Sequence, residues 1–100
     1  MTLLDAEIKQ RRIDFGVCLK TIRLKARLSQ EKLAQTAEVD RKTISRIENG
    51  HLSPSLDICW AIAEVLKIDL YELFLPMAHG KLPRELEAKL RLEDQIIQAG

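Results

Sequence analysis

The stretch Ser29-Gln-Glu-Lys-Leu-Ala-Gln-Thr-Ala-Glu-Val-Asp-Arg-Lys-Thr-Ile-Ser-Arg-Ile-Glu-Asn-Gly50 predicts two short helices joined by a tight turn. Ser29 can cap the first helix, because its hydroxyl can accept a hydrogen bond from a free amide of the opening turn. Asp40 can cap the second helix in the same way, and Gly50 is a stop signal after it. Only residues 37–39 are left for the turn, so the two helices must cross at a steep angle.

Each of these two helices has an apolar face. Leu33, Ala34 and Ala37 share one face of the first helix, and Ile44 and Ile47 share one face of the second. Spacings of three and four residues place side chains on the same side of a helix. Two short helices that cross through a tight turn form a helix-turn-helix motif.

The outward residues of the second helix are polar, and three of them are cationic. Arg and Lys on a short helix suit the major groove of DNA, where they can donate to guanine O6 and N7. The same pattern also fits a solvated helix face, and charge alone does not separate the two. The outward residues are Arg41, Lys42, Thr43, Ser45 and Arg46.

A longer set of positions at fixed spacing surrounds this motif. These positions are Leu28-Ser29-Gln30-Glu31, Leu33-Ala34, Val39, Ile44-Ser45, Ile47-Glu48-Asn49-Gly50, Pro54-Ser55-Leu56, Ile62-Ala63, Leu66, Ile68, Leu73 and Phe74. With them the chain resembles the Xre/lambda-repressor-like (Cro-type) helix-turn-helix family over about residues 15–74. The resemblance implies an all-α fold, namely a five-helix DNA-binding domain, to which this chain adds a C-terminal helix.

The resemblance also implies roles for individual residues. It assigns contacts with DNA bases to Arg41, Lys42, Thr43 and Arg46. It assigns contacts with phosphate to Gln30 and to the backbone near Asn49. We expect Ser45 and Arg27, which lies shortly before Gln30, to contact phosphate as well. A structural ion pair is expected between Arg23 and Glu48, which would tie the first helix of the domain to the end of the recognition helix.

Two turn positions depart from the family pattern. Glu38 stands where Gly is usual between the two helices, and Arg27 stands where Gly often closes the helix before them. A residue other than Gly in the left-handed region costs about 1 kcal/mol. We therefore expect these turns to be adjusted or slightly strained, and Glu38 to place an acid near the DNA face.

The residues before the motif predict a helix over about residues 14–25. Its core side would carry Phe15, Cys18, Leu19 and Ile22, and Asp14 could be its N-cap. The preceding residues would either extend this helix or form a separate short one. Both thiols of the chain, Cys18 and Cys59, are expected to be reduced core residues, because disulfides are rare in cytosolic proteins.

After the motif, Ser55 can cap a helix over residues 56–66, with Trp60 half-buried beside its apolar stripe. The predicted buried face of this helix is Leu56, Cys59, Ile62, Ala63 and Leu66. Asp69 and Glu72 fit a capping box for a helix over residues 70–75, which Pro76 would end.

We expect two parts: residues 1–76, a helix-turn-helix domain with its core at 14–75 and a possible N-terminal helical extension, and residues 77–100. The second part would be a linker followed by a helix over residues 84–99. Its interrupted apolar stripe is Leu82, Leu86, Leu90 and Ile97. This stripe can pack on the domain, on a second copy or on another partner, and the sequence leaves these open.

Charge is unevenly distributed although the net charge is only +1. Residues 9–46 hold eleven Lys and Arg against four Asp and Glu, whereas residues 47–100 hold five against nine. A basic motif beside an acidic C-terminal half is consistent with one face turned to phosphates. No apolar run reaches the ~18 residues of a membrane helix, and the N-terminus lacks signal-peptide features, so a cytoplasmic protein is expected.

These observations favour a sequence-specific DNA-binding transcriptional regulator, a homodimeric repressor on a two-fold symmetric operator in double-stranded DNA. One alternative is an antitoxin that binds a toxin through the C-terminal helix and autoregulates its operon. A restriction-modification controller protein would also fit, and an adaptor without DNA activity is a further alternative. No catalytic constellation, metal-ligand spacing or cofactor motif is present, so we expect neither an enzyme nor a cofactor.

Overall fold

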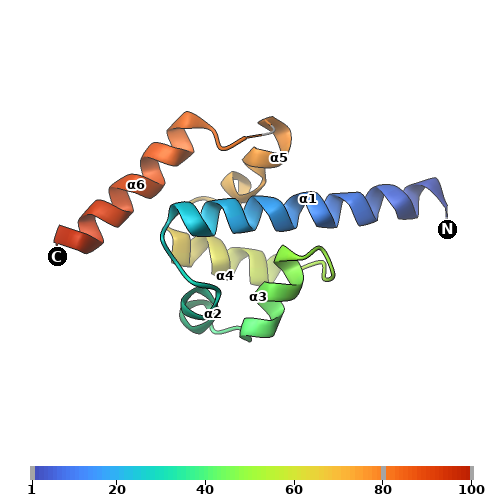
Figure 1. Ribbon diagram of the computed structural model, residues 1–100, viewed down its shortest axis with the longest axis horizontal. Helices are drawn as coiled ribbons and strands as arrows, with labels where there is room; N and C mark the ends of the chain where they lie inside the picture. Colours follow the sequence, from blue (N-terminus) through green and yellow to red (C-terminus); the bar gives the residue numbers. More distant parts are fainter. Residues whose placement is uncertain (1, 80, 100) are drawn as a thin grey trace.

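The computed structural model describes residues 2–79 and 81–99, and every regular element in this part of the chain is a helix. The elements are α1 (Leu3–Lys25), α2 (Gln30–Ala37), α3 (Arg41–Glu48), α4 (Leu56–Leu66), the 3-10 helix η1 (Leu70–Phe74), α5 (Leu75–His79) and α6 (Arg84–Ala99) (Figure 1). The predicted all-α fold is confirmed. None of the described helices is both long and apolar enough to cross a membrane.

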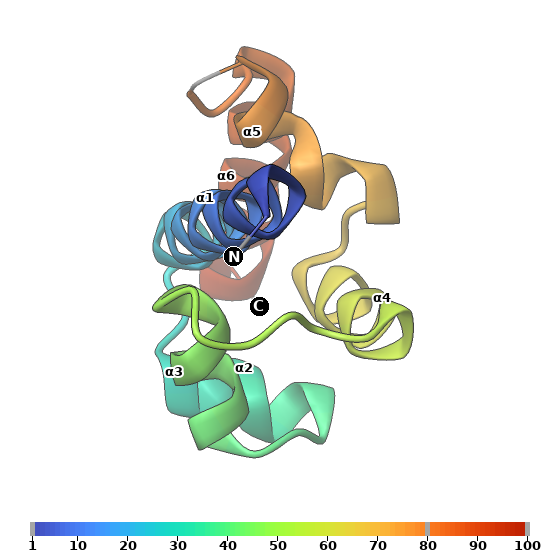
Figure 2. The same cartoon turned by 90° about the vertical axis from the view of Figure 1, so that its right-hand side faces the viewer.

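Helix α1 is the axis of the molecule. Figure 2 looks along it from its N-terminal end and shows α2 and α3 on one side and α5 on the opposite side. The first half of α1 extends beyond the other helices (Figure 1), and Leu4 and Ile8 on it are 64% and 47% exposed. One face of the second half is buried in the core, so the apolar spacing of α1 continues past the region that the core covers.

The start of α1 differs from the expected N-cap. Thr2 caps the helix: the Asp5 amide donates to Thr2 Oγ1 at 3.1 Å, and the Thr2 amide donates to Asp5 Oδ2 at 3.1 Å. Asp14 lies inside the helix, where its Oδ1 accepts from Gln10 Nε2 at 3.0 Å, so the prediction of an N-cap there was wrong. A strong cap at Thr2, with no Gly or Pro before Gly16, allows one continuous helix.

A single hydrophobic cluster joins the helices. The rings of Phe15 and Phe74 pack in a tilted arrangement with centroids 5.2 Å apart. Aliphatic side chains supply most of the remainder, as the low aromatic content requires, and each fully buried Leu or Ile contributes roughly 1.5–3 kcal/mol. The buried cluster is Phe15, Leu19, Ile22, Leu33, Ala34, Ile44, Ile47, Cys59, Ile62, Ala63, Leu66, Ile68, Leu73, Leu86 and Leu90.

Helix α4 has the predicted bounds, and its predicted cap is confirmed by a hydrogen bond from the Ile58 amide to Ser55 Oγ at 3.1 Å. The prediction that Leu56 is buried was wrong, since its side chain is 56% exposed. Leu56 borders an open groove at the start of α4, and none of the other helices covers it in the part of the chain that the structure describes. Trp60, expected to be half-buried, is 55% exposed.

Pro76 does not end the helical region, contrary to prediction. It is the second residue of α5, which continues to His79. The first amides of a helix have no partner within that helix, so the missing N–H of Pro costs nothing there. Met77 therefore lies in a helix, although we expected a linker to begin with it.

Helix α6 packs back onto the domain. Leu86 and Leu90 are each 1% exposed and belong to the common core, and Leu82 packs against it. Lys89 Nζ lies 2.8 Å from Glu72 Oε1, and Lys25 Nζ lies 2.9 Å from Glu87 Oε1. The side chain of Ile97, the last member of the predicted stripe, lies outside the described part of the chain.

Both cysteines, Cys18 and Cys59, are buried free thiols. Burial raises the pKa of the Cys18 thiol to about 11, and the Asp14 carboxylate adds to that increase. Burial also raises the pKa of the Cys59 thiol. The thiolate is the reactive form, so both residues are chemically quiet members of the core.

Candidate nucleic-acid interface

Helices α2 and α3 start at their predicted caps. Ser29 Oγ accepts from the Lys32 amide at 2.9 Å, which confirms the first cap. Asp40 occupies the N-cap position of α3, but its side chain makes no cap hydrogen bond. Its backbone carbonyl instead accepts from the amides of Thr43 and Ile44 at 2.9 and 3.4 Å. The prediction of a side-chain cap by Asp40 was therefore wrong.

The turns around α2 adopt the geometry that glycine usually provides. Glu38 has φ +59° and Arg27 has φ +60°, both in the left-handed region. The Val39 amide then donates to the Ala34 carbonyl at 2.9 Å, and the Leu28 amide to the Arg23 carbonyl at 3.1 Å. The chain keeps these closed turns although a residue other than glycine costs roughly 1–2 kcal/mol at each.

The rotation of α3 about its own axis is fixed by its inner face. Ile44 and Ile47 are fully buried and Glu48 is nearly so, which turns the opposite face of the helix outward. Arg41, Lys42 and Arg46 are exposed, and Thr43 and Ser45 are partly exposed. The residues expected to contact bases therefore lie on one helix, on the face opposite to the core.

The residues expected to contact phosphate lie around the ends of α2 and α3. Arg27 is exposed in the turn before α2, and Gln30, which is partly exposed, is the first residue of that helix. Asn49 is exposed just after α3, and its Nδ2 lies 3.5 Å from Ser45 Oγ. These positions surround the cationic face of α3 with polar groups.

An ion pair joins the C-terminal ends of α1 and α3. Arg23 Nε donates to Glu48 Oε2 at 2.7 Å, and Arg23 Nη2 donates to Glu48 Oε1 at 3.1 Å. The two side chains are only 7% and 2% exposed. The structure thus brings Arg23 and Glu48 together in a bidentate pair, the strongest geometry available to these groups.

The same pair also contacts the start of α2 and the turn before it. Gln30 Nε2 donates to Glu48 Oε1 at 3.0 Å, and Arg23 Nη1 donates to the Leu28 carbonyl at 2.7 Å. Glu48 therefore orients the first side chain of α2 before any ligand is present. Sequence reasoning expected the pair but not this bond to Gln30.

Gly16 is a structural residue that the sequence analysis missed. A Cβ atom at this position would lie 2.5 Å from the Ile47 carbonyl oxygen and 2.6 Å from the Glu48 carbonyl oxygen. Glycine therefore allows α1 to approach the C-terminal end of α3 closely. An isolated glycine inside a helical pattern was the signal that could have found it.

The end of α3 is closed by the predicted glycine stop. Gly50 has φ +75°, and its amide donates to the Ile47 carbonyl at 3.0 Å. The His51 amide donates to the Arg46 carbonyl at 2.8 Å. A Cβ at position 50 would lie 2.8 Å from the side chain of Ile13, so this turn also packs closely on α1.

The exposed cations of this surface, Arg41, Lys42 and Arg46, suit the binding of an anion. Their guanidinium and ammonium groups lie on α3, whose opposite face is fixed by buried Ile44 and Ile47 and by the Arg23–Glu48 pair. In the described part of the chain, no three His, Cys, Asp or Glu side chains are grouped closely enough to hold a metal ion. The arrangement therefore suits binding to a polyanion with a groove wide enough for a helix.

Comparisons with known proteins agree with this geometry. A family model described as Helix-turn-helix matches residues 19–73. An uncharacterized HTH-type transcriptional regulator of Archaeoglobus fulgidus is 35% identical over 57 residues, which cover 57% of this chain and 80% of the relative. A similar regulator of Methanocaldococcus jannaschii is 37% identical over 57 residues, covering 57% of this chain and 86% of the relative.

A solved structure shares the fold over most of the molecule. The clp gene regulator ClgR from Corynebacterium glutamicum superimposes with a TM-score of 0.65 over 88% of this chain and 87% of its own. Only 16% of the residues are identical, so this likeness concerns the arrangement of the helices.

Proposed function

Because the chain belongs to the helix-turn-helix family of DNA-binding transcription regulators, we propose that it is a sequence-specific homodimeric repressor that binds a two-fold symmetric operator. One observation carries the proposal: the exposed cationic face of α3. Buried Ile44 and Ile47 and the buried Arg23–Glu48 pair hold this face in a single orientation. Such rigid presentation is what discrimination between bases requires.

The side chains of α3 read the base edges in this proposal. Arg41, Lys42 and Arg46 donate to purine acceptors in the major groove, and Thr43 contacts either a polar edge or a thymine methyl group. Each good bidentate contact discriminates against a wrong base by about 1–3 kcal/mol. Sequence selectivity therefore rests on a few side chains from one eight-residue helix.

The surrounding polar groups set the position of the protein on the DNA backbone. Arg27, Gln30, Ser45 and Asn49 contact phosphate oxygens. Gln30 also lies in the opening turn of α2, whose free amides favour an anion. Its hydrogen bond to Glu48 Oε1 arranges this contact in advance.

The short length of α3 is the reason for proposing a homodimer. Eight residues of α3 span only a few base pairs, so one copy cannot select an operator alone. Two copies related by a two-fold axis would present their recognition helices about 34 Å apart, one turn of DNA. A restriction-modification controller protein is one regulator of this kind, and its operator would have the same symmetry.

The antitoxin alternative receives less support from the C-terminal helix. Leu86 and Leu90 of α6 are buried in the core of their own chain, and Lys89 pairs with Glu72. A segment awaiting a toxin would be expected to leave such residues uncovered. The packing of α6 therefore supports the simple regulator.

Selection from a random duplex library at near-physiological salt tests the proposal. We expect an inverted repeat to be enriched by the wild-type chain. Arg46→Ala should abolish that enrichment, whereas Lys81→Ala, a matched loss of an exposed cation on the far side of α1, should leave it intact. Salt-sensitive binding without any enriched sequence would contradict the proposal.

A further inference from the structure

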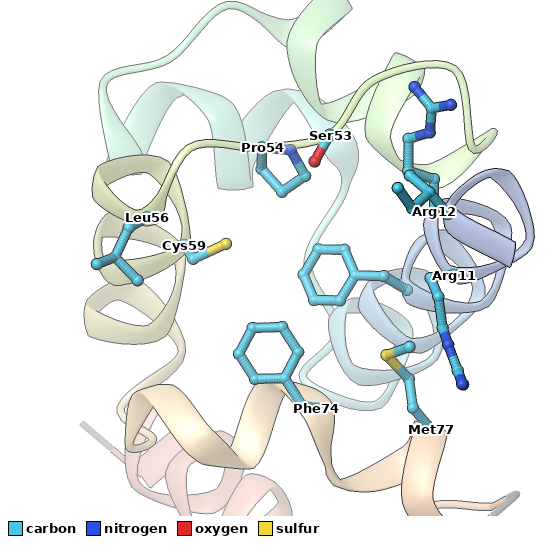
Figure 3. Close-up of a pocket in the computed structure, with 10 residues that line it drawn as sticks. Arg11, Arg12, Ser53, Pro54, Leu56, Cys59, Phe74 and Met77 are labelled. Carbon is cyan, nitrogen blue, oxygen red and sulfur yellow. The ribbon is translucent and has the colours of Figure 1, made fainter. Parts of the chain in front are cut away.

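The projecting half of α1 borders an open groove that the proposed DNA contacts do not use. The groove has a volume of about 360 Å³ and lies between α1, the start of α4 and the η1–α5 segment. Figure 3 shows Phe74 and Met77 on one side, Leu56 and Cys59 on another, and Arg11 and Arg12 along α1. The walls are mostly apolar, and the two arginines are the charged groups at the edge.

Several apolar side chains in and beside this groove are exposed. Leu4 and Ile8 on α1 are 64% and 47% exposed, and Leu56 and Phe74 are 56% and 40% exposed. Covering such surface is favourable by roughly 25 cal/mol for each Å². A contiguous apolar patch with a polar edge marks an interaction site more often than a bare surface.

We propose that this groove receives the first turns of α1 from a second copy of the chain, so that two α1 helices pack antiparallel about a two-fold axis beside Ile8. The inference rests on the proposed function, because it identifies the surface that forms the homodimer. Leu4 of each copy then lies against Phe15 of the other, and the two Ile8 side chains meet near the axis.

The charges of α1 are complementary to themselves in this arrangement. At about 100° per residue, Leu4, Ile8 and Phe15 form one stripe of the helix. Asp5 and Arg12 flank the stripe on one side, and a separate acid–base pair, Glu7 and Arg11, flanks it on the other.

When two antiparallel α1 helices are related by a two-fold axis, each flank of one helix meets the same flank of the other. The order of the residues along the two flanks is then reversed. Asp5 then faces Arg12 of the second copy, and Glu7 faces Arg11 of the second copy. Both pairings place the axis beside residues 8 and 9, so a single register satisfies all of the charges. Complementary charge fixes the register and orientation of an interface more than it adds affinity.

The groups concerned have unused bonding capacity within their own chain. Among the described residues, neither Arg11 nor Arg12 has a carboxylate partner, and Arg12 Nε is buried without a hydrogen-bond partner. A buried donor without a partner costs free energy, which favours a movement of the Arg12 side chain toward a carboxylate of the second copy. Asp5 accepts both Thr2 bonds at Oδ2, which leaves Oδ1 for such a contact.

The arrangement also suits an operator-binding dimer. Gly16, which touches the end of α3, lies roughly 80° around the α1 axis from Ile8, about a quarter of a turn. An axis that relates two antiparallel helices lies in the plane between them, also a quarter of a turn from the contact. The axis therefore points toward the α3 side of each copy (Figure 1), and both recognition helices face the same way.

Sedimentation of the full chain with groove variants tests the inference without DNA. We expect the wild type to be a dimer and Ile8→Asp to raise its dissociation constant about 30-fold or more, the effect of losing a central contact. Leu24→Asp is the matched control, because Leu24 is an exposed apolar residue at the other end of α1. It should leave the dimer unchanged.

Charge reversal gives a signature that a folding defect cannot imitate. Glu7→Arg alone and Arg11→Glu alone should each weaken the homodimer, since like charges then meet across the axis. An equal mixture of the two variants should form heterodimers at wild-type affinity, because every charge again meets its opposite. Charge effects within one helix are the same in homodimer and heterodimer, so this comparison isolates the contact between copies.

The outcomes separate this inference from the proposed function. A wild-type monomer, or a dimer insensitive to Ile8→Asp, overturns the inference even where an inverted repeat is enriched. Equal effects of Ile8→Asp and Leu24→Asp also overturn it. If Ile8→Asp weakens the dimer and Leu24→Asp does not, but no DNA sequence is enriched, the inference is supported and the proposed function is contradicted.

Discussion

Arg23 Nε lies 2.7 Å from Glu48 Oε2, and this contact ties the C-terminal end of α1 to the end of α3. The two side chains are 25 residues apart in the chain and almost fully buried. Both oxygens of Glu48 are engaged by Arg23, and one of them also by Gln30. Disturbing this pair should therefore affect stability and DNA recognition together.

Replacing either member of the pair with alanine should destabilise the fold. Arg23→Ala leaves the Glu48 carboxylate buried without its main partner, which costs about 3–5 kcal/mol. Thermal or denaturant unfolding measures this loss. Arg91→Ala removes a partner of Glu87 on the surface and should leave the midpoint nearly unchanged, because exposed pairs contribute little. An unchanged midpoint in both Arg23→Ala and Glu48→Ala would refute the structural role of the pair.

Gly16→Ala should destabilise the protein although alanine is the better helix former. The gain in helix propensity is about 1 kcal/mol, but the added Cβ would lie 2.5 Å from the Ile47 carbonyl oxygen. Backbone must then shift, at a typical cost of about 1–3 kcal/mol. Urea unfolding measures the balance, with Val17→Ala at the exposed neighbouring position as the control. A more stable Gly16→Ala protein would show that α1 and α3 are not packed this closely.

Gln30→Ala and Arg46→Ala should weaken DNA binding in different ways. Loss of a phosphate contact lowers affinity for operator and random DNA alike, whereas loss of a base contact lowers mainly the ratio between them. Gln30 carries no charge, so Gln30→Ala should also leave the salt dependence of binding unchanged. Fluorescence anisotropy titrations at several salt concentrations give both quantities. A reduced specificity ratio in Gln30→Ala would assign this residue to base recognition instead.

The Glu72–Lys89 contact should make stability depend on pH in the acid range. Burial raises the pKa of Glu72, but hydrogen bonds from Lys89 and the Asp69 amide, with the Lys89 charge, bring the pKa below its ordinary value. A carboxylate with a lowered pKa stabilises the fold above its unfolded pKa, and this contribution is lost as the pH falls through the folded value.

Glu72→Gln should therefore lower stability at neutral pH, by about 1 kcal/mol for a partly exposed partner. The difference from the wild type should disappear toward low pH. Unfolding midpoints measured across the acid range check this, with Glu64→Gln on the exposed side of α4 as the control. A difference that persists unchanged at low pH would show that charge on Glu72 is not the cause.

The two thiols should react slowly with a thiol reagent in the native protein. Both are buried, and their raised pKa values keep them protonated at neutral pH. Labelling with a chromogenic disulfide should accelerate strongly in denaturant, where both sulfurs become accessible. Rapid reaction of Cys18 or Cys59 in native buffer would show that the core around it opens readily.

Local chemistry made the central motif predictable. The Ser29 and Ser55 caps, the apolar spacing of Ile44 and Ile47, and the Gly50 stop are all short-range signals, and each is present in the structure. The outward direction of Arg41 and Arg46 follows from the same spacing. The motif was therefore predictable because its determinants lie within a few residues of one another.

The differences arise where distant segments or two competing local signals decide the outcome. The Thr2–Asp5 cap starts α1 earlier than the possible cap at Asp14 suggested. Each of these residues is a possible cap by itself, and neither shows which of the two the helix uses. Leu56 has the spacing of a buried residue, but no helix covers it among the described residues. Gly16 is required by the backbone of Ile47 and Glu48, 31 and 32 residues away in the sequence.

The burial of Leu86 and Leu90 has a consequence for the synthesis of the protein. Their places in the core lie beside α1, and α6 follows α1 to α5 in the chain, so this part of the core closes only after α6 has been made. Contacts of such long sequence separation form late and slow the folding of a small domain. Until then the part of α1 that α6 covers stays exposed, and a nascent chain that stops after α5 would offer that part to chaperones and proteases.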